Sequence, residues 1–371
     1  MSESNDPQLI SLSDFSALNK AIKKRRLLSL ALELTHRCNN NCVHCYINLS
    51  ANDKKAKKNE LSFEDIKDIV NQAFSMETLW VLLSGGEPLL RDDFCDIYIY
   101  LKEKGFLVSI FTNASLISKE HIEVFKKYPP RDIEVSVYGI SEITHKRITR
   151  KNTFTDTMKG IERLINSPLS FVLKTAVMQS NHKEFLQISE FCKKATNRPF
   201  KFDPFLTLRL DRNLRKNSRI IKERLSVEEI IELEKLDKNR STAIKKQCLS
   251  AGTDDLKEDE DIFRCRAGIN SGCIDCYGNF KLCSSLVRKE CIYDLKNGSL
   301  ADAWNNFTPH IRMKKSADPL FKKHCGSCSL VHLCMWCPAH SDLETGELDK
   351  PAPYFCDTAL KRYSYFNSDM P

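Results

Sequence analysis

Three cysteines near the start of the chain are spaced closely enough to bind a single inorganic cluster. They are Cys38, Cys42 and Cys45, in a C-x3-C-x2-C arrangement. Three thiolates this close can ligate three irons of a cubane [4Fe–4S] cluster and leave the fourth iron open to another ligand. The same spacing also suits a zinc-binding loop. The triplet therefore predicts a metal centre, with iron–sulfur and zinc both open.

A second group of cysteines lies in the last third of the chain. Ten of the 16 cysteines fall between positions 265 and 356. Seven of them follow a regular order: Cys265, then Cys283 with Gly278 before it, then Cys325-x2-Cys328-x5-Cys334-x2-Cys337, and finally Cys356. A segment with few long apolar runs buries little core, so we expect metal to hold it together. CxxC pairs also suit zinc knuckles, which remain an alternative here.

Alternating strand and helix patterns must position these thiols. Strand-like runs cover 27–35, 79–83, 106–111, 132–138, 170–178 and 200–208. Helical patterns lie between them, near 61–75, 91–104, 118–127, 154–166 and 183–195. Such alternation predicts parallel β/α units, and six units are too few for a complete eight-stranded barrel. The cysteine triplet then lies in the loop after the first strand.

Polar residues follow several of the predicted strands. The second strand leads into Gly85-Gly86-Glu87-Pro88, where two glycines would let the backbone approach a ligand and Glu87 would offer a carboxylate to a cation. Asn113 and Ser136 end the third and fourth strands, and Lys174 lies in the fifth. A polar residue at a strand end is also commonly a simple structural hydrogen-bonder, so each residue alone permits both interpretations.

Taken together, these motifs resemble those of a known enzyme family. The triplet with Tyr46 after it, and the Gly-Gly-Glu-Pro motif one β/α unit later, resemble the radical S-adenosylmethionine (radical SAM) enzymes. The seven ordered cysteines resemble the SPASM domain that some of these enzymes carry. The resemblance implies an α/β fold, with a partial (β/α)6 barrel followed by a small Cys-rich SPASM domain stapled by clusters.

The resemblance also implies cofactors and the residues that hold them. It implies S-adenosylmethionine (SAM), a SAM-binding [4Fe–4S] cluster on the triplet, and two auxiliary [4Fe–4S] clusters. Its SAM contacts would be Tyr46, Gly85, Gly86, Glu87, Asn113, Ser136 and Lys174. Its distal auxiliary cluster would be held by Cys325, Cys328, Cys334 and Cys356, and its near auxiliary cluster by Cys265, Cys283 and Cys337.

Two departures from the SPASM pattern concern the near cluster. The last cysteine pair is separated by two residues where three are usual, which makes the role of Cys337 less secure. Some relatives supply a fourth thiolate six residues after the first cysteine, and here that position is Ser271. Either Cys273 or Cys276 substitutes for it, or one iron is open to a substrate thiolate or another donor. We expect the remaining cysteines, Cys95, Cys192, Cys248 and Cys291, to be buried structural thiols.

Composition places the protein in a broad class. The chain has 371 residues and a net charge of +8 spread over scattered Lys and Arg, so we predict no nucleic-acid binding. No apolar run of membrane length occurs, and thiol-rich chains without a secretory signal are typically cytoplasmic. The predicted domains are an N-terminal segment (1–26), the radical SAM partial barrel (27–210), a helical bridge with an acidic linker (211–264) and the SPASM domain (265–371).

The resemblance implies an enzyme that reductively cleaves SAM to a 5′-deoxyadenosyl radical and abstracts a C–H hydrogen. Relatives with SPASM domains modify or crosslink ribosomally made peptides, so we expect a peptide or protein substrate, a separate peptide-recognition protein and a flavodoxin- or ferredoxin-type electron donor. The alternatives are a dehydrogenase of a small alcohol or sugar and a non-catalytic, metal-stapled interaction protein. Ser284 disfavours sulfatase maturation, because those relatives carry an aspartate there. We assign no catalytic acid or base from the sequence.

Overall fold

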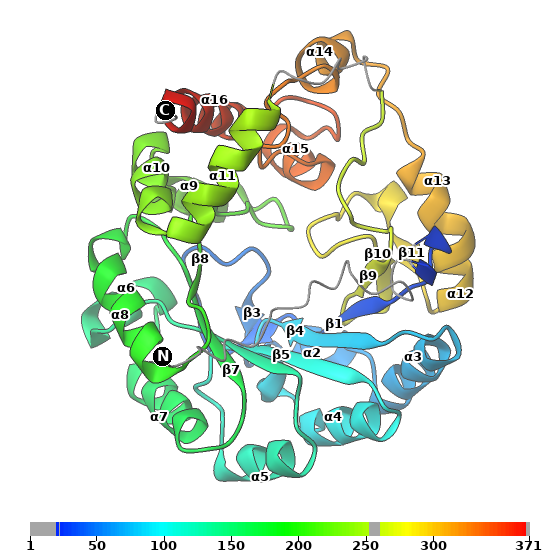
Figure 1. The fold of residues 1–371 in the computed structure, drawn as a ribbon. Coiled ribbons are helices and arrows are strands. Elements are labelled where there is room, and N and C mark those ends of the chain that lie inside the picture. The colour runs from blue at the N-terminus through cyan, green and yellow to red at the C-terminus, as the bar shows by residue number, and fades with distance from the viewer. Residues whose placement is uncertain (1–19, 22, 252–259, 369–371) are drawn as a thin grey trace, which may run out of the picture.

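Six parallel strands form the centre of the protein in the computed structural model, which describes residues 20–21, 23–251 and 260–368. They are β1 (Ser29–Thr35), β4 (Trp80–Gly85), β5 (Leu107–Thr112), β6 (Asp132–Ser136), β7 (Phe171–Ala176) and β8 (Lys201–Asp203). Each pairs in parallel with the next in chain order (Figure 1). The predicted α/β fold with six β/α strands is confirmed. Most of the predicted segment 1–26, and residues 254–259 of the acidic linker, lie outside the described ranges.

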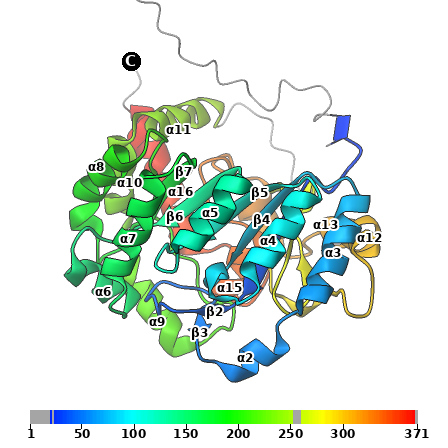
Figure 2. The same ribbon diagram turned by 90° about the horizontal axis from the view of Figure 1, so that it is seen from below.

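Helices cover the outer side of this curved sheet, as Figures 1 and 2 show from two directions. They are α3 (Phe63–Ser75), α4 (Phe94–Glu103), α5 (Lys119–Lys127), α6 (Glu142–Thr149), α7 (Phe154–Ile165) and α8 (Phe185–Ala195). Helix α3 begins at a capping box in which Ser62 and Asp65 satisfy each other's backbone N–H. The sequence pattern predicted all of these helices except α6.

Side chains alternate between two environments along each strand. In β4, Val81 and Leu83 are buried in the main core, whereas Leu82 and Ser84 face the inner cavity. Parallel strands covered on one side by helices therefore present every second residue to the inside of the partial barrel. This alternation selects which residues can reach a ligand.

The last predicted strand is shorter than expected. The apolar pattern predicted 200–208, but β8 ends at Asp203 because Pro204 has no N–H for the hydrogen-bond ladder. Phe205 and Leu206 are nevertheless buried, in two smaller clusters outside the main core. Burial, and not strand pairing, accounts for their apolar character.

The Cys-rich segment adds three strands to the opposite edge of the same sheet. These are β9 (Ser271–Ile274), β10 (Asn279–Lys281) and β11 (Tyr293–Asp294), and the sheet order is β11-β10-β9-β1-β4-β5-β6-β7-β8. Strand β9 runs parallel to β1, with Cys273 opposite Ala31. The change in composition near residue 265 is therefore not a break in the sheet.

Further helices join the partial barrel to the C-terminal end of the chain. Helices α9 (Leu214–Glu223), α10 (Val227–Leu236) and α11 (Lys238–Ser250) follow β8, and α10 and α11 pack against α16 (Pro353–Ser368). The remaining elements are short: β2 (Arg37–Cys38), β3 (Leu49–Ser50), α2 (Lys54–Asn59), α12 (Leu300–Asp302), α13 (Thr308–Arg312), α14 (Pro319–Phe321) and α15 (Pro338–Thr345). Within the described residues, none of these helices has the length and apolar character to cross a membrane.

Candidate active site

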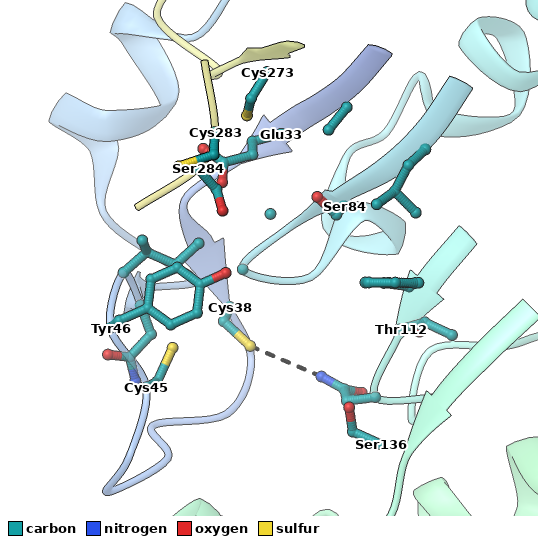
Figure 3. Close-up of a pocket in the computed structure, with 18 of the residues that line it drawn as sticks. Glu33, Cys38, Cys45, Tyr46, Ser84, Thr112, Ser136, Cys273, Cys283 and Ser284 are labelled. Atoms are coloured by element: carbon teal, nitrogen blue, oxygen red, sulfur yellow. Dashed lines mark hydrogen bonds between the residues drawn. The ribbon is translucent and has the colours of Figure 1, made fainter. Parts of the chain in front are cut away.

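The inner side of the partial barrel encloses a cavity of about 610 Å³. Its walls come from the carboxyl ends of the parallel strands, the triplet loop and the β9–β10 hairpin (Figure 3). The cavity is lined by all three triplet thiols together with Tyr46, Gly85, Gly86, Asn113, Ser136 and Lys174. Of the predicted SAM contacts, only Glu87 does not line it. Motifs spread over more than a hundred residues thus meet in one space.

Backbone hydrogen bonds hold the triplet loop against the end of α6. Asn41 N donates to Thr149 O at 2.8 Å, and Val43 N donates to Ile148 O at 2.9 Å. The buried Arg209 guanidinium donates to Cys45 O at 3.0 Å and anchors the other end of the loop. The loop is therefore held by partners from distant parts of the chain.

The triplet thiols lie in a setting that suits a metal cluster. Burial raises the pKa of the Cys38 thiol to about 12, with the Glu87 carboxylate adding to the shift. Burial also raises the pKa of Cys42 well above its ordinary value, and the neighbouring Cys45 and Cys38 add to that shift. The raised pKa values favour the protonated thiols, whereas a bound cationic metal centre would favour their thiolates.

Two buried polar atoms beside the thiols have no protein partner. They are Asn40 Nδ2 and His44 Nδ1, and both residues line the cavity. Burial lowers the pKa of His44 to about 4, so its imidazole is neutral. A buried polar atom without a partner costs free energy unless a ligand satisfies it. The loop is thus chemically suited to a polar cofactor in addition to a metal cluster.

The two glycines of the Gly-Gly-Glu motif allow two backbone segments to approach each other closely. A Cβ on Gly86 would lie 2.3 Å from Arg37 O, and one on Gly85 would lie 2.2 Å from Thr35 O. Gly86 N donates to Thr35 O at 2.7 Å across this close approach. The glycines therefore allow the end of β4 to contact the backbone that leads into the triplet, although both also line the cavity.

Glu87 does not line the cavity, and its carboxylate is held by protein donors. It is fully buried and accepts hydrogen bonds from Thr112 Oγ1 at 2.8 Å, Asn113 N at 2.7 Å and Leu89 N at 3.2 Å. Burial raises its pKa to about 7, against the opposing effect of these three donors. Glu87 therefore fixes the backbone of Asn113, whose side chain reaches the cavity.

Asn113 and Lys174 reach the cavity while retaining protein partners. Asn113 Nδ2 lies 3.8 Å from Cys38 Sγ, the contact drawn as a dashed line in Figure 3. Lys174 Nζ donates to Glu134 at 3.0 Å and lies 3.2 Å from the centre of the Phe111 ring. An amide and an ammonium group are thus available at the carboxyl ends of β5 and β7.

The wall opposite the triplet is polar, which the sequence did not indicate. Glu33, in β1, is buried and lines the cavity, and Lys281 Nζ lies 3.7 Å from its carboxylate and 3.6 Å from that of Asp275. Tyr46 hydrogen-bonds through its hydroxyl to Ser284 on the same wall. A charged residue inside an otherwise apolar strand was the one available signal for Glu33.

A second cavity, of about 250 Å³, lies in the Cys-rich segment. It is lined by Cys265, Cys325, Cys328, Cys334, Cys337 and Cys356. Burial raises the pKa of Cys325 to about 12, and the thiols of Cys356, Cys334 and Cys328 add to the shift. The four cysteines expected to form the distal set are therefore close neighbours in the fold.

The three cysteines expected to form the near set lie between the two cavities. Burial raises the pKa of Cys283 to about 11, and the thiols of Cys337 and Cys265 add to the shift. Cys283 lines the first cavity, whereas Cys265 and Cys337 line the second. No group of three or more His, Cys, Asp or Glu in the described residues is arranged around one metal ion. A cubane cluster holds its thiolates farther apart than a single ion does.

The four cysteines that we expected to be structural, Cys95, Cys192, Cys248 and Cys291, line neither cavity. Cys192, Cys248 and Cys291 are buried, as expected of structural thiols. Cys95 is only partly buried, and it packs against the main core. Their positions agree with a packing role.

Comparison with known proteins identifies the domain around the first cavity. Residues 32–192 match the family model described as the radical SAM superfamily. The AdoMet-dependent heme synthase of Methanosarcina barkeri is 31% identical over 166 residues, which is 44% of this chain and 47% of that protein. The mycofactocin maturase MftC of Mycolicibacterium smegmatis is 28% identical over 45% of this chain and 41% of that protein. The chain spans about half the length of these curated relatives or less.

Solved structures resemble a larger share of the chain. Streptococcus suis SuiB bound to its precursor peptide SuiA gives a TM-score of 0.67 at 19% identity, over 92% of this chain and 78% of that one. The structure of anSMEcpe with bound AdoMet gives a TM-score of 0.61 at 12% identity, over 92% of this chain and 97% of that one. At these identities the likeness establishes a shared fold that includes the Cys-rich segment.

Proposed function

Because residues 32–192 form a radical SAM domain, we propose that the protein is a radical SAM enzyme of the SPASM type that modifies a ribosomally made peptide. The observation that carries the proposal is the single cavity shared by the triplet thiols and Cys283. It would bring a cofactor on the triplet and an auxiliary cluster to opposite sides of one substrate.

The residues of the first cavity fit the implied cofactors. Cys38, Cys42 and Cys45 would hold a [4Fe–4S] cluster. The cluster and SAM together would supply one-electron cleavage chemistry, which generates a 5′-deoxyadenosyl radical able to take a hydrogen atom from a C–H bond. Lys174 would pair with the cofactor carboxylate, and Asn113, held by Glu87, would donate to its polar groups.

Tyr46 and Ser136 would complete this cofactor pocket. Both line the cavity, Tyr46 on the triplet loop and Ser136 at the end of β6. The buried walls would exclude water from the reacting carbon, which protects a reactive radical from side reactions. These roles rest on the positions of the residues, together with the radical SAM domain.

A peptide substrate is supported by the relatives and the structural neighbours. SuiB was crystallised with its precursor peptide, and MftC and the subtilosin biosynthesis protein AlbA of Bacillus subtilis are among the relatives. Two auxiliary [4Fe–4S] clusters, on the near and distal cysteine sets, would carry electrons to or from a flavodoxin- or ferredoxin-type protein. A separate peptide-recognition protein would present the substrate.

The first test is the iron and acid-labile sulfide content of anaerobically reconstituted protein. We expect about twelve irons per chain, and about eight when Cys38, Cys42 and Cys45 are all replaced by alanine. Reduction in the presence of SAM should yield 5′-deoxyadenosine only with the triplet intact. Bound zinc with no loss of metal in the triple variant would reject the radical SAM assignment.

The second test concerns the substrate. Small open reading frames beside the gene would be co-expressed with the enzyme, and the peptides analysed by mass spectrometry for loss of a pair of hydrogen atoms. Modification by wild type but not by the triple variant would support a peptide maturase. The relatives also include GTP 3′,8-cyclases, so turnover of a nucleotide or small alcohol without peptide modification would favour a small-molecule enzyme.

A further inference from the structure

We propose that Cys273 is the fourth ligand of the near auxiliary cluster, which is then closed by Cys265, Cys273, Cys283 and Cys337. This inference rests on the proposed function, because it presupposes that the near cluster exists. It selects one of two candidate cysteines and excludes an open iron.

The strand geometry places Cys273 on the side of the sheet that faces the cavity. Residues two apart in a strand point to the same face, and Ser271 and Cys273 both line the cavity with Cys283. Relatives that supply a fourth thiolate do so at the position of Ser271. Cys273 therefore presents a thiol from the same face of the same strand, two residues farther along the chain than Ser271.

The hairpin brings Cys273 and Cys283 together. Lys281 lies opposite Cys273 in the β9–β10 pairing, and Cys283 follows two residues after Lys281. Figure 3 shows both sulfur atoms on the upper wall of the cavity, beside Glu33. The two thiols interact electrostatically, as neighbouring ligands of one cluster would.

Charged groups lie beside both thiols. The ammonium group of Lys281 is almost completely buried, and it acts on both Cys273 and Cys283. It also lies 3.7 Å from the Glu33 carboxylate and 3.6 Å from that of Asp275. The selection of Cys273 therefore depends on its place in the strand and not on these charges.

The other candidate, Cys276, faces a different part of the protein. It lies beyond the end of β9, where its carbonyl accepts a hydrogen bond from Leu61 N at 2.8 Å. It lines a narrow space beneath α3, together with Leu34, Leu61 and Ile66, and does not line the cavity that holds Cys283. Cys276 therefore cannot reach the near cluster without rearrangement of the hairpin.

The hydroxyl of Ser271 is another donor on this face of β9. Soft thiolates are preferred over oxygen ligands in iron–sulfur clusters, so a nearby cysteine should displace it. With Cys273 bound, the near cluster has no vacant iron for a substrate thiolate. Its role would then be electron transfer, with the substrate held by the polar wall instead.

The test uses the 371-residue chain with Cys38, Cys42 and Cys45 replaced by alanine, so that only auxiliary clusters remain; this triple variant is the parent protein. Cys273→Ala is compared with the matched control Cys276→Ala by iron content and by electron paramagnetic resonance (EPR) of the reduced clusters. Each is recorded with and without added 2-mercaptoethanol. We expect the Cys273→Ala spectrum to change when the thiol occupies the vacated iron, or iron to fall by up to about four per chain.

The parent and Cys276→Ala proteins should both keep about eight irons and give spectra that the thiol does not alter. Cys273→Ser is a second variant in case Cys273→Ala misfolds. Its hydroxyl oxygen should bind the vacated iron, so the cluster should be retained with an altered EPR spectrum. A thiol response in the parent, or a Cys273→Ala spectrum identical to the parent, would overturn the inference. A parent without about eight irons would instead reject the auxiliary clusters themselves.

Discussion

Replacement of Gly86 by alanine tests whether the Gly-Gly motif serves the fold of the triplet or the approach of a ligand. An added Cβ would lie 2.3 Å from Arg37 O and 2.7 Å from His36 O. Both oxygens belong to backbone, so no side-chain rotation relieves the clash. The backbone must separate, and the segment that moves leads directly into Cys38.

The cost follows from the hydrogen bonds that would be lost. Gly86 N donates to Thr35 O at 2.7 Å, and Glu87 N donates to Arg37 O at 3.0 Å. Each contributes about 0.5–1.5 kcal/mol net, and about 1–3 kcal/mol if a buried partner is left unpaired. We expect Gly86→Ala to lower the free energy of unfolding by about 2–5 kcal/mol and to displace the triplet loop.

The assay measures iron content and thermal unfolding of the reconstituted protein at one scan rate. Gly86→Ala should lose up to about four irons and unfold several degrees lower than wild type. The matched control is Gly105→Ala, because Gly105 has a φ of +86° but nothing within 4 Å of its added Cβ. It should cost only about 1–2 kcal/mol of backbone strain and keep all its iron. Wild-type iron content and stability in Gly86→Ala, with only SAM binding weakened, would refute the structural explanation.

Three further substitutions have distinct expected outcomes. Glu87→Gln should destabilise the protein most at pH 5. Because the pKa of the Glu87 carboxyl is raised to about 7, the protonated carboxyl stabilises the wild-type fold at low pH, and this stabilisation is lost as pH rises through 7. The difference between wild type and variant in the free energy of urea unfolding should therefore shrink by up to about 3 kcal/mol by pH 8. Arg362→Met should lower stability by about 3–5 kcal/mol, because it leaves the buried Glu234 carboxylate, 2.9 Å from Arg362 Nε, without its main partner; adding Glu234→Leu should restore part of the loss. Lys174→Met should change stability by less than about 1 kcal/mol, because Glu134 keeps Lys201, while weakening SAM binding about tenfold by isothermal titration.

Most of the fold was predictable because its signals are local. Alternating apolar residues in strands, amphipathic helices and the Ser62 cap are each written within a few neighbouring residues. Strand β9 carries no such signal, because it has only four residues, one of them Gly272. It pairs with β1, more than two hundred residues earlier, and no local pattern specifies such a distant partner.

The chemistry of the candidate site was more predictable than its geometry. Spacing identified the thiols, because ligands of one cluster must lie close together. The direction of the Glu87 carboxylate was not predictable, since it depends on donors supplied by β5 and the loop after it. The choice between Cys273 and Cys276 follows from strand periodicity, but only once β9 is known to exist.

Strand β1 would determine how far apart the two proposed metal centres lie. The carboxyl end of β1 leads into the triplet, and Glu33 of β1 lines the cavity. One edge of β1 pairs with β4, and the other pairs with the hairpin that carries Cys273 and Cys283. The triplet and the near thiols are therefore joined by a hydrogen-bonded sheet and not by an interface that can slide. Because rates of electron transfer depend on the separation of the centres, a shared sheet would keep that separation constant during turnover. Disruption of the β1–β9 pairing should thus impair both centres together.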